Sequence, residues 1–117
     1  VVMANVPFAN SLLMTQAMVN DVFTAQIVCW NDPRLQALNP QVELPAEAIR
    51  RTVRNKTSGT TSTFTHSLAR MAGLHSGDCE QHLLQCSSNP MWPQPNLSTI
   101  HMHCPCYTPT KLSVQAA

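Results

Sequence analysis

Cysteine and histidine side chains that can bind metals or form disulfides are concentrated in the C-terminal part of the chain. The cluster between residues 79 and 106 consists of Cys79, His82, Cys86, His101, His103, Cys104 and Cys106. Thiolate and imidazole groups are the ligands that Zn²⁺ and Cu⁺ prefer in proteins. No Cys-x-x-Cys pair occurs, and the spacings match no standard zinc-site pattern. A metal site, disulfides and inert reduced cysteines therefore all stay open as interpretations.

The pairing of these cysteines depends on the structure between the first two. If residues 78–85 form a helix, Cys79 and Cys86 lie about 10.5 Å apart along its axis, and a disulfide requires Cα atoms within roughly 7 Å. The two would then pair with Cys104 and Cys106, which is the arrangement we predict. If the segment is a loop, Cys79 can instead close directly onto Cys86.

Two further features bear on the compartment. Cys29 is the odd cysteine in this scheme and is expected to be a buried free thiol. Glycosylation sequons occur at Asn55 and Asn96, both in expected loops. An even set of paired cysteines beside sequons favours an oxidising environment. We therefore expect an extracellular protein, with a place inside an organellar complex as the alternative.

Charge and composition exclude several classes of function. Seven basic and six acidic residues give a net charge of +1, so no basic field attracts nucleic acid. The basic residues Arg50, Arg51, Arg54 and Lys56 are interpreted as a solvated helix face in preference to a phosphate site. The chain has three glycines and shows no glycine-rich phosphate loop and no nucleophile elbow. We therefore expect a protein that is not an enzyme.

The elements that position these residues are expected to be mainly helical. Residues 10–30 have an amphipathic pattern with Asn10 or Ser11 as cap, although residues 22–30 also alternate like a strand. The Asn-Asp-Pro sequence at 31–33 indicates a turn. A short helix over residues 46–53 follows Pro45.

The second half has one clear helix and then breaks up. Residues 56–63 are expected to be a loop, and residues 62–72 a helix with Phe64, Leu68 and Met71 facing inward and Gly73 as its C-cap. Repeated prolines exclude long elements after residue 90. The predicted fold is a small, irregular, mainly α domain at residues 1–89, with a Pro-rich tail or loop at 90–117 packed on it.

The apolar N-terminal helix is the predicted partner-binding surface. Met18, Val22 and Phe23 belong to a broad apolar stripe, which would dock on a protein partner or a second copy of the chain. The equally open alternative is that the stripe is the core helix. Polar residues interrupt residues 12–30, so no membrane span is expected. Only 11% of residues are charged, against about 25% typically, which also favours an assembled or extracellular protein.

One stretch resembles a known family. A Trp-Asn-Asp-Pro-Arg-Leu segment at 30–35, an Asn-Pro turn at 39–40 and a Leu-Pro-Ala segment at 44–46 followed by Ile49 resemble the extracellular ligand-binding domain of Cys-loop receptors and acetylcholine-binding proteins. The resemblance implies a β-sandwich, as the alternative to the mainly α fold.

The same resemblance assigns roles to later residues. Cys79 and Cys86 would form the characteristic disulfide loop, and the Cys104–Cys106 segment with Tyr107 would form the tip that closes over agonist. Trp92 and Tyr107 would contact a cationic ligand.

Three functions follow from these observations. The first is a non-enzymatic binding or structural subunit of a larger assembly. The second is an extracellular ligand-binding module of the receptor type. The third is a small Zn- or Cu-binding protein, although no cofactor is required by the first two.

Overall fold

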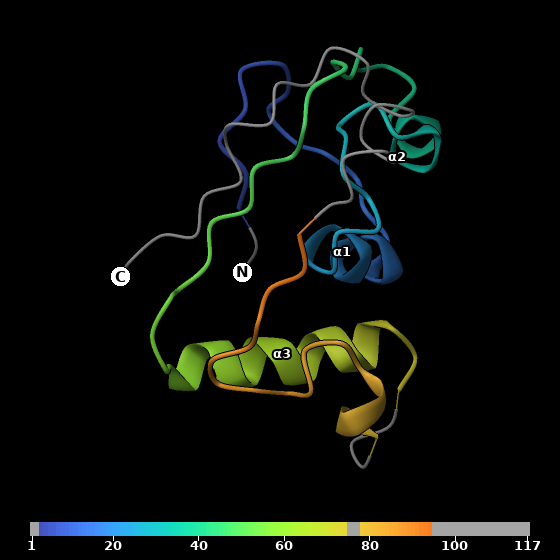
Figure 1. Cartoon of the computed structure of the whole chain (residues 1–117). Coiled ribbons are helices and arrows are strands. Elements are labelled where there is room, and N and C mark those ends of the chain that lie inside the picture. The colour runs from blue at the N-terminus through green and yellow to red at the C-terminus, as the bar shows by residue number, and fades with distance from the viewer. Residues whose placement is uncertain (1–2, 75–77, 95–117) are drawn as a thin grey trace.

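Helices joined by irregular segments make up the computed structural model, which describes residues 3–74 and 78–94. The elements are α1 (Gln16–Phe23), α2 (Pro33–Leu38), α3 (Gly59–Met71) and the 3₁₀ turn η1 (Cys79–Gln81) (Figure 1). Within these residues no extended strand occurs, and Cys29 and Ala48 form an antiparallel β-bridge. The prediction of a mainly helical, irregular fold is confirmed at this level, and the β-sandwich is not supported.

Helix α1 is much shorter than the predicted helix over residues 10–30. The Thr15 side chain caps it by accepting from the Met18 N–H at 3.1 Å. The helix ends because the Thr24 hydroxyl bonds to the Asn20 carbonyl at 2.8 Å, and Ala25 then takes a left-handed φ of 63°. The long helix and its cap at Asn10 or Ser11 were therefore wrong predictions.

The predicted helix over residues 46–53 is also wrong. This segment runs beside residues 28–30, where the Trp30 N–H donates to the Glu47 carbonyl and the Ile49 N–H donates to the Val28 carbonyl, each at 2.9 Å. Pairing with a distant segment thus satisfies the backbone that a helix would have satisfied locally.

Helix α2 begins where the sequence indicated a turn. The Asp32 carboxylate caps it by accepting from the Arg34 N–H at 3.0 Å, and Pro33 is its first residue. At its end, the buried Asn39 side chain accepts from the Leu13 N–H at 2.8 Å and donates to the Leu13 carbonyl at 2.9 Å. This side chain fixes the segment that leads into α1.

Helix α3 is the longest element, and its inward face agrees with the prediction. Leu68 is fully buried, while Phe64 and Met71 are partly buried against the core. Gly73 follows the helix with a φ of 86°, which a glycine adopts without strain. The helix begins earlier than predicted, inside the stretch expected to be a loop, because Ser58 caps it.

Two clusters of buried side chains form the core: Val22, Ile27 and Ile49 in one, and Leu68, Leu84 and Trp92 in the other. Phe23 of α1 packs against both and meets the ring of Phe64 edge-on, with 4.8 Å between ring centroids. Figure 1 shows α1 lying across α3, with the segment after η1 running along α3 before it turns toward α1. The core therefore packs against α3 through Phe64, Leu68 and Met71.

The predicted division of the chain at residue 89 stays a prediction. Residues 90–94 of the expected tail are described, and Trp92 among them is buried in the core. Residues 95–117 lie outside the described part of the chain. Among the described helices, none combines the length and the apolar character needed to cross a bilayer.

Candidate functional site

The N-terminus of α3 presents backbone donors to solvent. A helix leaves its first four N–H groups without intrahelical acceptors. The Ser58 N–H donates to the Ser88 carbonyl at 3.0 Å, and the Thr61 N–H donates to the Ser58 hydroxyl at 3.3 Å. The amides of Gly59 and Thr60 have no acceptor among the described residues, and both residues are exposed.

Positive charge surrounds these two amides. The Arg54 guanidinium donates to the Ser58 hydroxyl at 3.0 Å, so it is held beside the first turn. Lys56 lies in the same short loop and is exposed. The helix dipole adds about half a positive charge at this end. A Cβ atom at Gly59 would meet no atom within 4 Å, so a ligand can approach the backbone closely there.

The neighbouring basic residue Arg51 has a structural role instead. It is buried, and its guanidinium donates to the Phe23 carbonyl at 2.7 Å and also to the Pro93 carbonyl. Removal from water lowers the pKa of Arg51. The prediction that the basic residues share one solvated helix face was therefore wrong, because their segment is not helical and they divide between core and surface.

A cavity of about 430 Å³ adjoins the start of α3. Arg54, Thr60 and Thr61 line it on the polar side, and Phe64 and Trp92 line it on the apolar side. The indole Nε1 of Trp92 is buried without a hydrogen-bond partner among the described residues. The N-terminus of α3 is thus next to a cavity.

The cysteine pairing differs from the predicted one. Cys79 is bonded to Cys86, with 5.4 Å between their Cα atoms. The distance is short because residues after η1 form turns, and Gln85 and Cys86 both take a φ of 52°. The loop alternative in the sequence was therefore the right one. Cys29 is itself disulfide-bonded, so its prediction as a free thiol was wrong.

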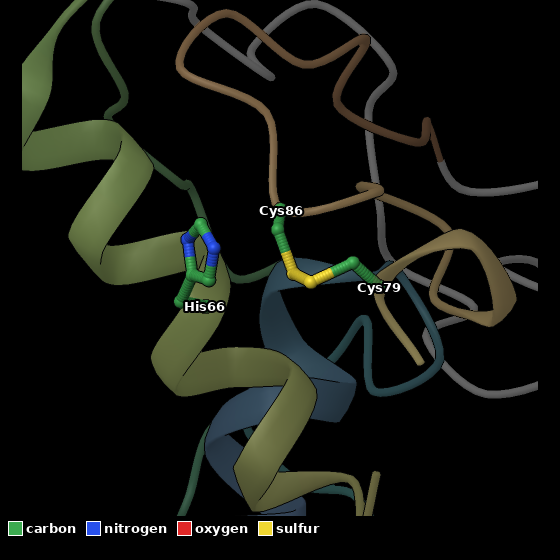
Figure 2. A group of neighbouring side chains, drawn as sticks. All are labelled: His66, Cys79 and Cys86. Carbon is green, nitrogen blue, oxygen red and sulfur yellow. A yellow bond between two sulfur atoms is a disulfide. The ribbon is translucent and has the colours of Figure 1, made fainter. Parts of the chain in front are cut away.

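His82 is not available as a metal ligand in this fold. Its Nε2 bonds to the Asn20 side-chain oxygen at 2.7 Å, and its Nδ1 accepts from the Leu84 N–H at 3.2 Å. The ring is buried, and desolvation lowers the pKa of His82. Figure 2 shows that a different histidine, His66 of α3, lies beside the disulfide. No spacing pattern in the sequence groups His66 with the cysteines.

The remaining candidate residues are scattered. Val22 is buried, and Met18 and Phe23 pack against its cluster, so this face contributes to the core, and its docking on a partner stays a prediction. Asn55 is exposed beside the α3 terminus. The candidates that lie outside the described residues are Asn96, His101, His103, Cys104, Cys106 and Tyr107.

Sequence reasoning missed the α3 terminus, although a signal was present. A serine followed by glycine and two threonines, directly before an apolar-periodic run, has the pattern of a helix cap. Ser58 and Gly59 match no longer glycine-rich phosphate loop, which is the pattern that usually indicates such a site.

The chain is similar to phosphate-binding proteins. It is 45% identical over 60 residues to the phosphate-binding protein PstS 3 of Mycobacterium leprae, a match that covers 51% of this chain and 16% of that protein. It is 32% identical over 88 residues to PstS3 of Mycobacterium bovis, covering 75% of this chain and 20% of that protein. A third match is the phosphate-binding protein PstS of Haemophilus influenzae, 38% identical over 63 residues.

The matches cover only a small part of each relative's length. The matched region spans about a fifth of the length of the curated relatives, at 20% of the Mycobacterium bovis protein and 19% of the Haemophilus influenzae protein. No protein-family model matches the chain.

The resemblance to Cys-loop receptor domains is overturned by these relatives, which are phosphate-binding proteins. The structure explains the motif differently. The segment at 30–35 opens helix α2 through the Asp32 cap, and it does not end a strand. Trp92, which the resemblance placed at an agonist site, is buried in the core against Leu68 and Leu84.

Proposed function

We propose that this chain is a non-enzymatic binding module for phosphate and that it holds the anion at the N-terminus of α3. The observation that carries the proposal is the pair of amides at Gly59 and Thr60, which have no acceptor among the described residues and follow Ser58, whose hydroxyl Arg54 contacts. The relatives bear the name of phosphate-binding proteins, which supports phosphate as the anion.

The local chemistry suits a tetrahedral oxyanion. Backbone N–H groups at a helix N-terminus donate to anion oxygens, and the helix dipole favours negative charge at the same point. An arginine fork adds charge-assisted hydrogen bonds to phosphate. Thr60 offers a hydroxyl from the first turn, and the exposed Lys56 precedes that turn in the chain.

The affinity is expected to be modest, since the chain matches only part of the longer relatives. A charge-assisted hydrogen bond contributes about 1.5–3 kcal/mol, and the helix dipole contributes about 0.3–1 kcal/mol. Their sum corresponds to a Kd of roughly a millimolar or weaker.

Titration with inorganic phosphate, followed by amide chemical shifts, tests the proposal. The Gly59 and Thr60 amides should shift most, with half-saturation at about a millimolar phosphate or above. Arg54→Gln should weaken binding by roughly tenfold or more, the equivalent of about 1.5 kcal/mol.

Arg70→Gln is the matched control, because Arg70 is exposed in the last turn of the same helix. It removes the same charge about 16 Å away along the axis and should leave binding almost unchanged. Equal weakening by the two substitutions would show non-specific charge attraction, and unmoved Gly59 and Thr60 amides would refute the proposed site.

The compartment and partners belong to the same proposal. Bonded cysteines at Cys29, Cys79 and Cys86 support an oxidising, extracellular environment. A protein partner stays part of the proposal through the stripe that carries Met18 and Phe23. Mass measurement of the protein purified from its native compartment should show the disulfides intact, and it would also show any glycan at Asn55.

A further inference from the structure

We propose that the Cys79–Cys86 disulfide, when reduced, becomes a binding site for Zn²⁺ in which His66 is the third protein ligand. In the oxidised chain the two sulfur atoms and a ring nitrogen of His66 lie within 4.8 Å of one another. Figure 2 shows the imidazole reaching toward the sulfurs from α3. This site is separate from the phosphate site proposed at the start of the same helix.

The distances suit one tetrahedral ion. Zn–S bonds of about 2.3 Å and Zn–N bonds of about 2.0 Å place neighbouring ligand atoms roughly 3.3–3.8 Å apart. Only small side-chain movements separate that arrangement from the observed one. Two cysteines and one histidine leave a fourth position open for water, a ligand set found in zinc proteins.

The hydrogen bond of the His66 ring selects the tautomer that zinc needs. Its Nδ1 lies 2.7 Å from the Ser62 carbonyl oxygen, which can only accept a hydrogen bond. In the neutral ring Nδ1 therefore carries the proton, and Nε2 has the lone pair that a ligand offers. A carbonyl partner on the other ring nitrogen is the usual second contact of a zinc-binding histidine.

The cysteines are held near each other without the disulfide. Leu84, between them, is fully buried in the core, and the carbonyl of Ser87 accepts from the Thr65 hydroxyl of α3 at 2.9 Å. His82 ties the same loop to α1 through Asn20. Breaking the S–S bond therefore leaves the loop attached to α3, so both sulfurs stay beside His66.

The three proposed ligands differ in their exposure to solvent. Cys86 is buried, Cys79 is partly exposed and His66 is exposed. An ion can thus enter from the His66 side while the core shields it on the Cys86 side.

The chemistry balances with a dithiol as reductant. The dithiol gives two electrons and two protons to the S–S bond and itself becomes a disulfide, and Cys79 and Cys86 become thiols. Zn²⁺ then replaces the two thiol protons, which leave to water, and Nε2 of His66 donates its lone pair. Reoxidation would expel the ion, so the site is open only under reducing conditions.

Zinc binding to the full chain is the test, measured by competition with a chromophoric chelator. A phosphine serves as reductant, since a dithiol would bind zinc; the phosphine takes its oxygen from water and ends as phosphine oxide. The reduced chain should bind one Zn²⁺, and the oxidised chain should bind at least tenfold more weakly. Co²⁺ in place of Zn²⁺ should show a thiolate-to-cobalt charge-transfer band in the reduced chain.

His66→Gln and Cys86→Ser should each weaken binding by at least tenfold in the reduced chain. The matched control is the double substitution His101→Gln and His103→Gln, which removes the two histidines that precede Cys104 in the sequence and should have no effect. His66 is exposed, so His66→Gln tests the site without disturbing the core, and circular dichroism checks this. Undiminished binding by His66→Gln, loss of binding in the control, or equal binding by oxidised and reduced chains would each overturn the proposal.

Discussion

The buried His82 should make the stability of the fold depend on pH. Its Nδ1 accepts from the Leu84 N–H, and its Nε2 lies 2.7 Å from the Asn20 oxygen. The neutral ring with its proton on Nε2 satisfies both contacts. A second proton would sit on Nδ1 and face the Leu84 N–H, so protonation replaces an attraction by a repulsion in a buried place.

The direction and ceiling of the effect follow from linkage. Burial lowers the pKa of His82 below its ordinary value of about 6.5. Below that pH the unfolded chain binds more protons than the folded chain, so unfolding is favoured. The stabilisation is fully present above pH 6.5 and is lost as the pH falls toward the lower folded pKa. Between pH 6.5 and pH 5 the loss can reach about 2 kcal/mol, at 1.36 kcal/mol for each pH unit.

Urea unfolding at pH 8 and pH 5 measures this loss. In the wild type the free energy of unfolding should fall at the lower pH, by no more than about 2 kcal/mol. His82→Gln should be less stable at pH 8, because it disturbs the contacts of Asn20 and Leu84, but most of its pH dependence should be gone. His66→Gln, which removes an exposed histidine, should keep the wild-type dependence. A wild type with equal stability at both pH values would refute the reasoning.

Further predictions concern the stability of the core and the state of the disulfides. Leu68→Ala, at a fully buried position, should lower the free energy of unfolding by about 2–5 kcal/mol in urea titration, and a smaller loss would show a loosely packed core. Asn39→Ala should cost about 1–3 kcal/mol in the same assay, because it removes three hydrogen bonds from a buried side chain. Mass mapping of the unreduced protein should join Cys79 to Cys86 in one peptide pair and find Cys29 oxidised; a free thiol at Cys29 would contradict the structure.

Local signals in the sequence were enough to predict the middle of α3 but not the segments that pair over long distances. Phe64, Leu68 and Met71 recur at helical spacing, so their shared face was visible in the sequence. Residues 46–53 also have helical spacing and a proline before them. Their backbone pairs with residues 28–30 instead, and no local pattern records a partner so far away in the chain.

The same contrast applies to the cysteines. The choice between pairing Cys79 with Cys86 and pairing it with a distant cysteine depended on whether the intervening residues were helical. The left-handed φ of Gln85 and Cys86 turns the chain so that Cys79 and Cys86 can bond. Neither glutamine nor cysteine is a residue type that indicates a positive φ in a sequence. Sequence spacing alone therefore left both pairings open.

The proposed anion site could not be predicted from the sequence, because it depends on the path of the loop after η1. The Ser88 carbonyl of that loop accepts the Ser58 N–H, and the Ser58 hydroxyl accepts the Thr61 N–H. These two contacts satisfy half of the terminal donors of α3. The N–H groups of Gly59 and Thr60 are then the terminal donors that a ligand can use. Ser88, thirty residues from Ser58 in the chain, thus helps to determine which amides of the helix stay available.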